Sequence, residues 1–123
     1  MNSQLSTVDR IRSELTRIKS LPSSEAVTMP PAYYTSEGFL QLESEHLFRK
    51  QWICLGHQGE IPNPGDYYTT ELVDEQLLVT RGKDGLIKVY SNVCRHRGNT
   101  VAEGRGNAAR FSCSYHGWTY SGE

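Results

Sequence analysis

The chain contains two short segments, Cys94-Arg95-His96-Arg97-Gly98 and Cys113-Ser114-Tyr115-His116-Gly117-Trp118, each with a cysteine and a histidine close together before a glycine. Sixteen residues separate His96 from Cys113, so the pattern is C-x-H-x16-C-x-x-H. Residues two apart on an extended backbone face the same side, and a tight loop can bring ligands separated by two residues to one centre. Glycine after each pair lets the backbone pass close to a bound group and direct N–H groups at it. The pattern therefore predicts two loops that bind one metal centre.

The cysteine and histidine content favours a metal centre over disulfides. The chain has three cysteines and four histidines, whereas small secreted scaffolds usually carry more cysteines in even number. Two cysteines and two histidines could also bind zinc, but common zinc fingers order their ligands Cys-Cys-His-His, so the alternating order fits zinc poorly. Cys54 lies in an apolar run and is interpreted as a buried structural thiol. His46 and His57 are interpreted as ordinary packed or solvent-facing side chains.

Composition excludes several classes of function. The 123 residues include 13 Lys plus Arg and 14 Asp plus Glu, for a net charge of −1, which argues against binding to nucleic acid or to an anionic membrane. Hydrophobic residues make up 37% of the chain, enough for a small core. No apolar run approaches the roughly 18 residues of a membrane span. The N-terminus lacks the apolar stretch of a secretory signal, so we expect a cytoplasmic location.

The N-terminal part predicts two helices and a linker. Ser6 with Asp9 resembles a capping box, and an apolar residue recurs every three or four positions, which predicts an amphipathic helix within residues 1–20. These apolar residues are Leu5, Val8, Ile11, Leu15 and Ile18. Prolines at 22, 30 and 31 predict an extended linker over residues 21–35. A second helix is expected from Thr35 or Ser36 to about Gln51.

The remainder of the chain has the pattern of a small antiparallel β fold. Short β-prone runs alternate with turn residues, and Lys83-Asp84-Gly85 is typical of a hairpin turn. The runs are 52–57, 67–72, 76–81, 86–90, 110–113 and 118–120. Many short strands with glycine-rich turns predict a mainly β barrel or sandwich, preceded by the helices.

The two loops resemble those of a Rieske [2Fe-2S] centre, in which two thiolates hold one iron and two imidazoles hold the other. Their sequences are similar to the Rieske domain of aromatic ring-hydroxylating oxygenase α subunits: Cys-x-His-Arg-Gly, then Cys-x-Tyr-His-Gly-Trp. The segments 61–67 and 92–99 also look like that family, and the resemblance covers about residues 30–123. It implies that the cluster and metal ligands are Cys94, His96, Cys113 and His116.

Residues beside the ligands receive expected roles as well. Tyr115 and Trp118 are expected to shield the cluster from water, with Tyr115 donating a hydrogen bond to sulfur. Arg97, like Arg95, could complement the reduced cluster or a partner's carboxylate, or could simply be solvated. The full set of supporting residues is Arg97, Gly98, Tyr115, Gly117 and Trp118. Respiratory-chain Rieske proteins carry an extra cysteine in each loop, forming a disulfide. Asn99 and Tyr115 stand at those positions here, so the resemblance is to the oxygenase type.

The resemblance implies that residues 36–123 form a Rieske domain, incomplete at its C-terminus, at the start of a longer oxygenase α subunit, an oxidoreductase. Such mono- and dioxygenases also use a mononuclear iron, held by two histidines and one carboxylate in a separate downstream domain. His46 and His57 sit in no such motif, so we expect no catalytic residue and no oxygenase activity in this chain alone. Its substrate, an aromatic compound or a quaternary ammonium compound, would be chosen by that other domain.

The resemblance also implies partners. An NAD(P)H-dependent reductase or a ferredoxin would donate electrons, and the full-length protein would form a homotrimer or an α/β hetero-oligomer. The alternative is a stand-alone Rieske ferredoxin that carries electrons without a substrate. The helices in about the first 50 residues favour the oxygenase α subunit, because a small carrier has little use for them.

Overall fold

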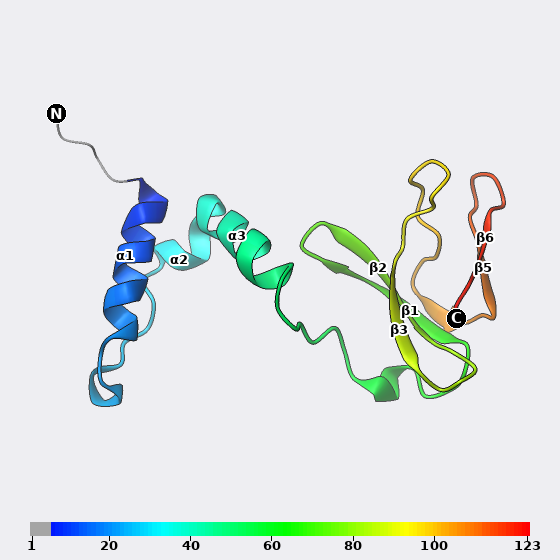
Figure 1. Cartoon of the computed structure of the whole chain (residues 1–123), viewed down its shortest axis with the longest axis horizontal. Helices are drawn as coiled ribbons and strands as arrows, with labels where there is room; N and C mark the ends of the chain where they lie inside the picture. Colours follow the sequence, from blue (N-terminus) through cyan, green and yellow to red (C-terminus); the bar gives the residue numbers. More distant parts are fainter. Residues whose placement is uncertain (1–5) are drawn as a thin grey trace. The chain divides into compact units, whose positions relative to one another are not determined.

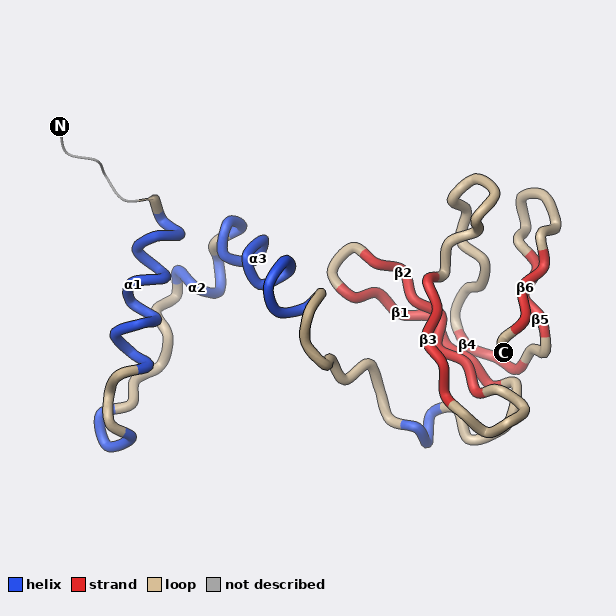
Figure 2. Tube along the Cα trace, viewed as in Figure 1, coloured by secondary structure: helices blue, strands red, loops and turns tan. Residues whose placement is uncertain are grey.

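The computed structural model describes residues 6–123 and divides the chain into two compact units, residues 1–52 and residues 53–123. Helices make up the first unit and antiparallel strands the second (Figures 1 and 2). This confirms the predicted mainly β class with N-terminal helices. No helix within residues 6–123 is long and apolar enough to cross a membrane.

The first unit is built around helix α1, Thr7–Lys19, which confirms the first predicted helix. Ser6 caps it by accepting a hydrogen bond from the Asp9 N–H at 3.2 Å. Ile11 is the buried residue of α1, and its carbonyl accepts a hydrogen bond from the Tyr33 hydroxyl at 2.8 Å. Leu5, the first of the predicted apolar positions, lies outside the described residues.

The segment between the two predicted helices is less extended than expected. It contains a 3-10 turn, η1 at Ser23–Glu25, and a short helix, α2 at Ala32–Thr35. Proline fixes φ near its helical value, so Pro31 suits the position just before α2. Helix α3, Glu37–Glu43, then continues as a π-helical turn, η2 at Ser44–Phe48, where the second helix was predicted.

The second unit contains a four-stranded antiparallel sheet in the order β3-β2-β1-β4. Its strands are β1 Asp66–Leu72, β2 Glu75–Arg81, β3 Ile87–Ser91 and β4 Arg105–Asn107. Strands β5 Arg110–Ser112 and β6 Thr119–Ser121 form a separate two-stranded ribbon. The core of the unit is the buried cluster of Ile61, Tyr68 and Val79, against which Leu55 packs.

Side-chain contacts among the described residues join the ribbon to the larger sheet. The Thr80 hydroxyl donates a hydrogen bond to the Gly122 carbonyl at 2.9 Å, and both residues are buried. The Phe111 ring lies edge-on to Tyr67, with ring centroids 5.0 Å apart. These contacts fix the end of the ribbon that lies opposite the turn between β5 and β6.

The predicted strand over residues 52–57 is wrong. This segment pairs with no strand among the described residues; its Leu55 carbonyl instead accepts a hydrogen bond from the Tyr68 hydroxyl at 3.3 Å. His57 then caps a 3-10 turn, η3 at Gln58–Glu60. Because the segment is not covered by a neighbouring strand, Cys54 is exposed, and the prediction of a buried thiol is wrong as well.

Glu60 ties η3 to strand β4. Its carboxylate accepts a hydrogen bond from the His57 N–H at 3.1 Å and pairs with Arg105 at 2.6 Å. These interactions, the His57 N–H first and the Arg105 side chain next, lower the pKa of Glu60 from its usual value. The carboxylate therefore stabilises the fold above the ordinary pKa of about 4.3, and the contribution disappears as the pH falls through the lower folded-state pKa.

Glu60→Gln should therefore reduce the thermal stability at pH 7 and have a smaller effect near pH 3. Thermal unfolding of both proteins across that range is the measurement. Glu103→Gln, which removes the same charge at an exposed position, is the matched control. An equal loss for Glu60→Gln at both pH values would show that the charge of Glu60 is not the cause.

Candidate metal centre

The first cluster loop, residues 93–100, follows strand β3 and closes on a buried asparagine. Asn92 is 1% exposed and forms two hydrogen bonds with Ala102: its Nδ2 donates to the Ala102 carbonyl at 2.8 Å, and its Oδ1 accepts from the Ala102 N–H at 2.9 Å. An isolated bridge between Val93 and Thr100 extends this closure by one pair. The base of the loop is thus held independently of any bound group.

The second cluster loop, residues 113–118, joins strands β5 and β6, and its backbone repeats that of the first loop. In both loops the cysteine N–H donates to the carbonyl five residues later, to Asn99 at 2.7 Å and to Trp118 at 2.8 Å. In both loops the glycine four residues after the cysteine donates its N–H to the cysteine carbonyl at 2.9 Å. The chain therefore uses one local turn twice.

This turn requires glycine because of its backbone conformation. Gly98 has a φ of 73° and Gly117 a φ of 71°, values that side chains with a Cβ rarely adopt. A Cβ added at either position would have no heavy atom of the protein within 4 Å, so the requirement comes from the backbone angle and not from crowding by neighbouring side chains.

The two cysteines of the loops lie together in the interior. Cys94 and Cys113 are each 3% exposed, and the Cys113 side chain, after the Tyr120 hydroxyl and the His96 N–H, contributes to lowering the pKa of Cys94. The Tyr120 hydroxyl lies 3.1 Å from the Cys94 sulfur and accepts a hydrogen bond from the Arg95 N–H at 3.0 Å. Since that N–H occupies the oxygen as an acceptor, we assign the hydroxyl as the donor to the sulfur.

This environment favours the thiolate of Cys94. The hydrogen bond from Tyr120, and after it the backbone N–H of His96, lower the pKa of Cys94 from its usual value. The same hydrogen bond raises the pKa of Tyr120. A thiolate is the form of cysteine that binds iron, so the loop prepares Cys94 for a metal.

The two histidines lie together at the exposed ends of the loops. The rings of His96 and His116 are 4.7 Å apart between centroids, and both residues are exposed. The Trp118 ring stacks on His96 at 5.1 Å with an interplanar angle of 4°, and the Tyr115 ring lies 3.9 Å from that of His116. In Figure 1 the loop after β3 and the loop between β5 and β6 extend at the same end of this unit.

The aromatic residues differ in part from their expected roles. Tyr115 and Trp118 flank the imidazoles and remain 58% and 50% exposed. The hydroxyl that reaches a cysteine sulfur belongs to Tyr120, whereas the sequence interpretation gave that hydrogen bond to Tyr115. The signal that could have identified Tyr120 is its position two residues after Trp118 on an extended segment, which directs both side chains to one side.

The other candidate residues are distributed as follows. Arg95 and Arg97 are exposed beside His96 in the first loop. His46 lies in η2 of the first unit. The His57 Nδ1 accepts a hydrogen bond from the Gly59 N–H at 3.1 Å, within η3.

The donors in the loops suit a two-iron cluster better than a single ion. Two buried sulfurs and two exposed imidazoles form two separate pairs, and each iron of a Rieske cluster takes one pair. A tetrahedral zinc would need all four side chains around one point. Within residues 6–123 no group of three or more His, Cys, Asp or Glu surrounds a position for a single metal ion.

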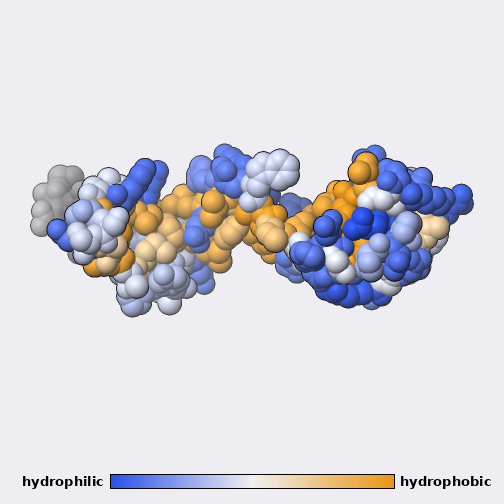
Figure 3. All heavy atoms as spheres, turned by 90° about the horizontal axis from the view of Figure 1, so that it is seen from below, coloured by the Kyte–Doolittle hydropathy of each residue, from blue (hydrophilic) through white to orange (hydrophobic). Residues whose placement is uncertain are grey.

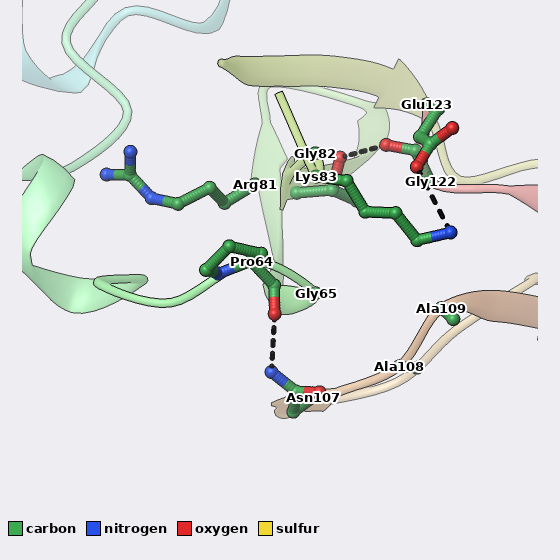
Figure 4. A pocket seen from close by; sticks show the side chains of 11 residues that line it. Pro64, Gly65, Arg81, Gly82, Lys83, Asn107, Ala108, Ala109, Gly122 and Glu123 are labelled. Atoms are coloured by element: carbon green, nitrogen blue, oxygen red, sulfur yellow. Dashed lines mark hydrogen bonds and ion pairs between the residues drawn. The ribbon is translucent and has the colours of Figure 1, made fainter. Parts of the chain in front are cut away.

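Elsewhere in this unit a hollow of about 270 Å³ lies between the ends of β2, β4 and the C-terminal residues (Figure 4). Lys83 and Glu123 form an ion pair of 3.7 Å on one side, and Asn107 donates to the Pro64 carbonyl at 3.0 Å on the other. None of its described lining residues is cysteine or histidine, so it offers no ligand of the kind gathered in the loops.

Hydrophobic side chains also reach the surface of this unit, among many hydrophilic ones (Figure 3). Ile87 and Val89 on strand β3 are 39% and 48% exposed. They line a shallow hollow of about 180 Å³ together with core residues such as Ile61.

A family model described as "Rieske [2Fe-2S] domain" matches residues 51–123. The α subunit of benzene 1,2-dioxygenase from Pseudomonas putida is 42% identical over 123 residues, which cover 98% of this chain and 27% of that relative. The oxygenase subunit of carnitine monooxygenase from Acinetobacter baumannii is 40% identical over 96 residues, covering 77% of this chain and 26% of that relative.

Among solved structures, naphthalene 1,2-dioxygenase from Rhodococcus sp. bound to indole superposes with a TM-score of 0.77 at 35% identity, over 94% of this chain and 26% of that chain. The chain thus spans about a quarter of the length of the relatives it matches.

Proposed function

Because the chain belongs to the Rieske [2Fe-2S] domain family, within the α subunits of Rieske oxygenases, we propose that its two loops hold that cluster. Cys94 and Cys113 would bind one iron, and His96 and His116 the other. When bound, the cluster accepts and releases single electrons. The observation that carries this proposal is the separation of the four side chains into a buried sulfur pair and an exposed imidazole pair.

The residues of the loops support this task in distinct ways. Burial of the two cysteines excludes water from the sulfur side of the site. The Tyr120 hydroxyl and the His96 N–H favour the thiolate form of Cys94, because both lower its pKa from the usual value. The imidazoles are exposed, so electrons would enter and leave at His96 and His116.

We further propose that the domain serves as the electron-accepting part of an oxygenase α subunit rather than as a stand-alone ferredoxin. The match to benzene 1,2-dioxygenase covers 98% of the chain, so it includes the helical unit before the sheet. An NAD(P)H-dependent reductase or a ferredoxin in the cytoplasm would supply electrons. A mononuclear iron in the catalytic domain of a homotrimer or an α/β hetero-oligomer would receive them.

We propose that the substrate is selected by another part of the oxygenase α subunit. Relatives named for benzene, chlorobenzene and carnitine share this domain at 38–44% identity. Because oxygenases named for such different compounds share this domain, the domain would perform the step that they have in common, which is the delivery of electrons. Aromatic and quaternary ammonium compounds are therefore the substrate classes to test.

The experiment is anaerobic isolation of the protein, followed by iron and sulfide analysis and EPR spectroscopy after reduction. We expect about two irons and two sulfides per chain and the EPR signal of a Rieske cluster. The loaded protein should be reduced by NADH in the presence of a ferredoxin–reductase pair. Stoichiometric zinc without inorganic sulfide would contradict the proposal.

A further inference from the structure

In each loop, the residue five positions after the cysteine contacts the opposite loop. Trp118 of the second loop stacks its ring on His96 of the first. Asn99 of the first loop directs its side-chain amide at the second loop. The Asn99 Nδ2 donates to the Cys113 sulfur at 3.7 Å and to the Ser114 hydroxyl at 3.3 Å.

The Thr100 carbonyl fixes the orientation of the Asn99 carboxamide, because a carbonyl oxygen can only accept a hydrogen bond. Its Nδ2 also lies 3.0 Å from the carbonyl oxygen of Thr100, so the nitrogen must face the second loop and the oxygen must face away. The two N–H protons of one amide thus serve three acceptors, one in its own loop and two in the other. Asn99 is partly buried, which protects these hydrogen bonds from competing water.

The two loops have no covalent link. Cys54, Cys94 and Cys113, the only cysteines of the chain, are all free. Among the described residues, the side-chain hydrogen bonds between the two halves of the site come from Asn99 and from Tyr120, which contacts Cys94 and Arg95. Each cysteine sulfur therefore faces a donor supplied from the opposite side of the centre.

We propose that the Asn99 carboxamide is a positioning residue that ties the first loop to the second and holds the Cys113 sulfur at the proposed cluster. This inference rests on the proposed function. An N–H directed at a sulfur ligand stabilises the more negative, reduced state, so Asn99 also raises the midpoint potential of the centre. A carboxamide that only closed its own loop through Thr100 would affect neither the potential nor the retention of iron.

The test uses the cluster-loaded, full-length protein and its variants Asn99→Leu and Asn99→Asp. Leucine has a similar volume but no donor, and aspartate keeps the shape while replacing both N–H donors by a negative charge. Release of iron to a chelator is monitored by the loss of visible absorbance. It should be about tenfold faster for Asn99→Leu, as expected for the loss of one hydrogen bond to a charged group. Both variants should have a lower midpoint potential, with the larger shift for Asn99→Asp.

Asn107→Leu is the matched control. The Asn107 amide donates to Pro64 and to Asp66 outside the loops, so this variant should lower thermal stability and leave iron release and potential unchanged. Asn99→Gln keeps the donors and should recover part of the wild-type potential. Asn99→Ser, which adds no apolar group, replaces Asn99→Leu in the test if the leucine variant does not fold.

The outcomes separate this inference from the proposed function. Wild-type protein without iron and sulfide would overturn both. A wild type that holds the cluster, together with Asn99 variants that match its release rate and potential, would overturn the role of Asn99 alone. Equal effects of Asn99→Leu and Asn107→Leu on iron release would also overturn it, because a general loss of stability would then be the cause.

Discussion

Replacing Cys94 with serine is expected to abolish cluster binding, whereas replacing Cys54 with serine leaves the cluster in place. The buried Cys94 thiol lies beside Cys113 and is activated by Tyr120. A serine hydroxyl is not deprotonated near neutral pH and cannot replace a thiolate ligand. Cys54 is exposed in another segment of the chain. Iron and sulfide per chain, with the EPR signal after reduction, measure the difference.

His116→Ala extends this test to the imidazole pair and should lose the cluster as well. Circular dichroism of each variant shows whether the sheet persists, so that loss of a ligand is distinguished from loss of the fold. Full iron and sulfide content in Cys94→Ser, or loss of both in Cys54→Ser, would contradict the ligand assignment.

Tyr120→Phe should keep the cluster and lower its midpoint potential by roughly 60 mV. The hydroxyl is directed at the Cys94 sulfur by the Arg95 N–H, and its removal deprives the more negative, reduced state of a hydrogen bond. If that bond favours the reduced state by about 1.4 kcal/mol, the shift for a one-electron couple is about 60 mV. Protein-film voltammetry at fixed pH gives the value.

Tyr90→Phe is the control for this experiment, since it removes a hydroxyl from strand β3 in the same unit. Its potential should equal that of the wild type. An unchanged potential in Tyr120→Phe, with the cluster intact, would show that the hydroxyl contact does not influence the electron affinity of the centre.

The amino-acid sequence predicts the loops well because their structure is local. The pattern of cysteine, histidine and glycine lies within five residues, and the two turns close through hydrogen bonds inside those same segments. Strands β1, β2 and β3 are also predictable, since each is a short β-prone run followed by a turn.

Features that depend on distant contacts were missed. Strand β4, Arg-Gly-Asn, has no apolar alternation, and Arg105 is held by Glu60 across 45 residues of chain. The segment 52–57 has the composition of a strand but meets no partner strand among the described residues. The sequence analysis did not assign donor roles to Tyr120 and Asn99, because their targets lie across the site and a local pattern does not reveal how the two loops meet.

The joining of the two loops by non-covalent contacts alone has a consequence for how the protein acquires its proposed cluster. Strands β5 and β6 have three residues each. Thr80 and Tyr67 hold the end of the ribbon remote from the loops, and hydrogen bonds of Tyr120 and Asn99 join its other end to the first loop. If each loop supplies half of the ligands, as proposed, binding of the cluster would also close the stretch of chain between them and reduce its remaining conformational entropy. We therefore expect iron insertion to strengthen contacts that the folded chain already makes between the loops, rather than to create the fold of the four-stranded sheet.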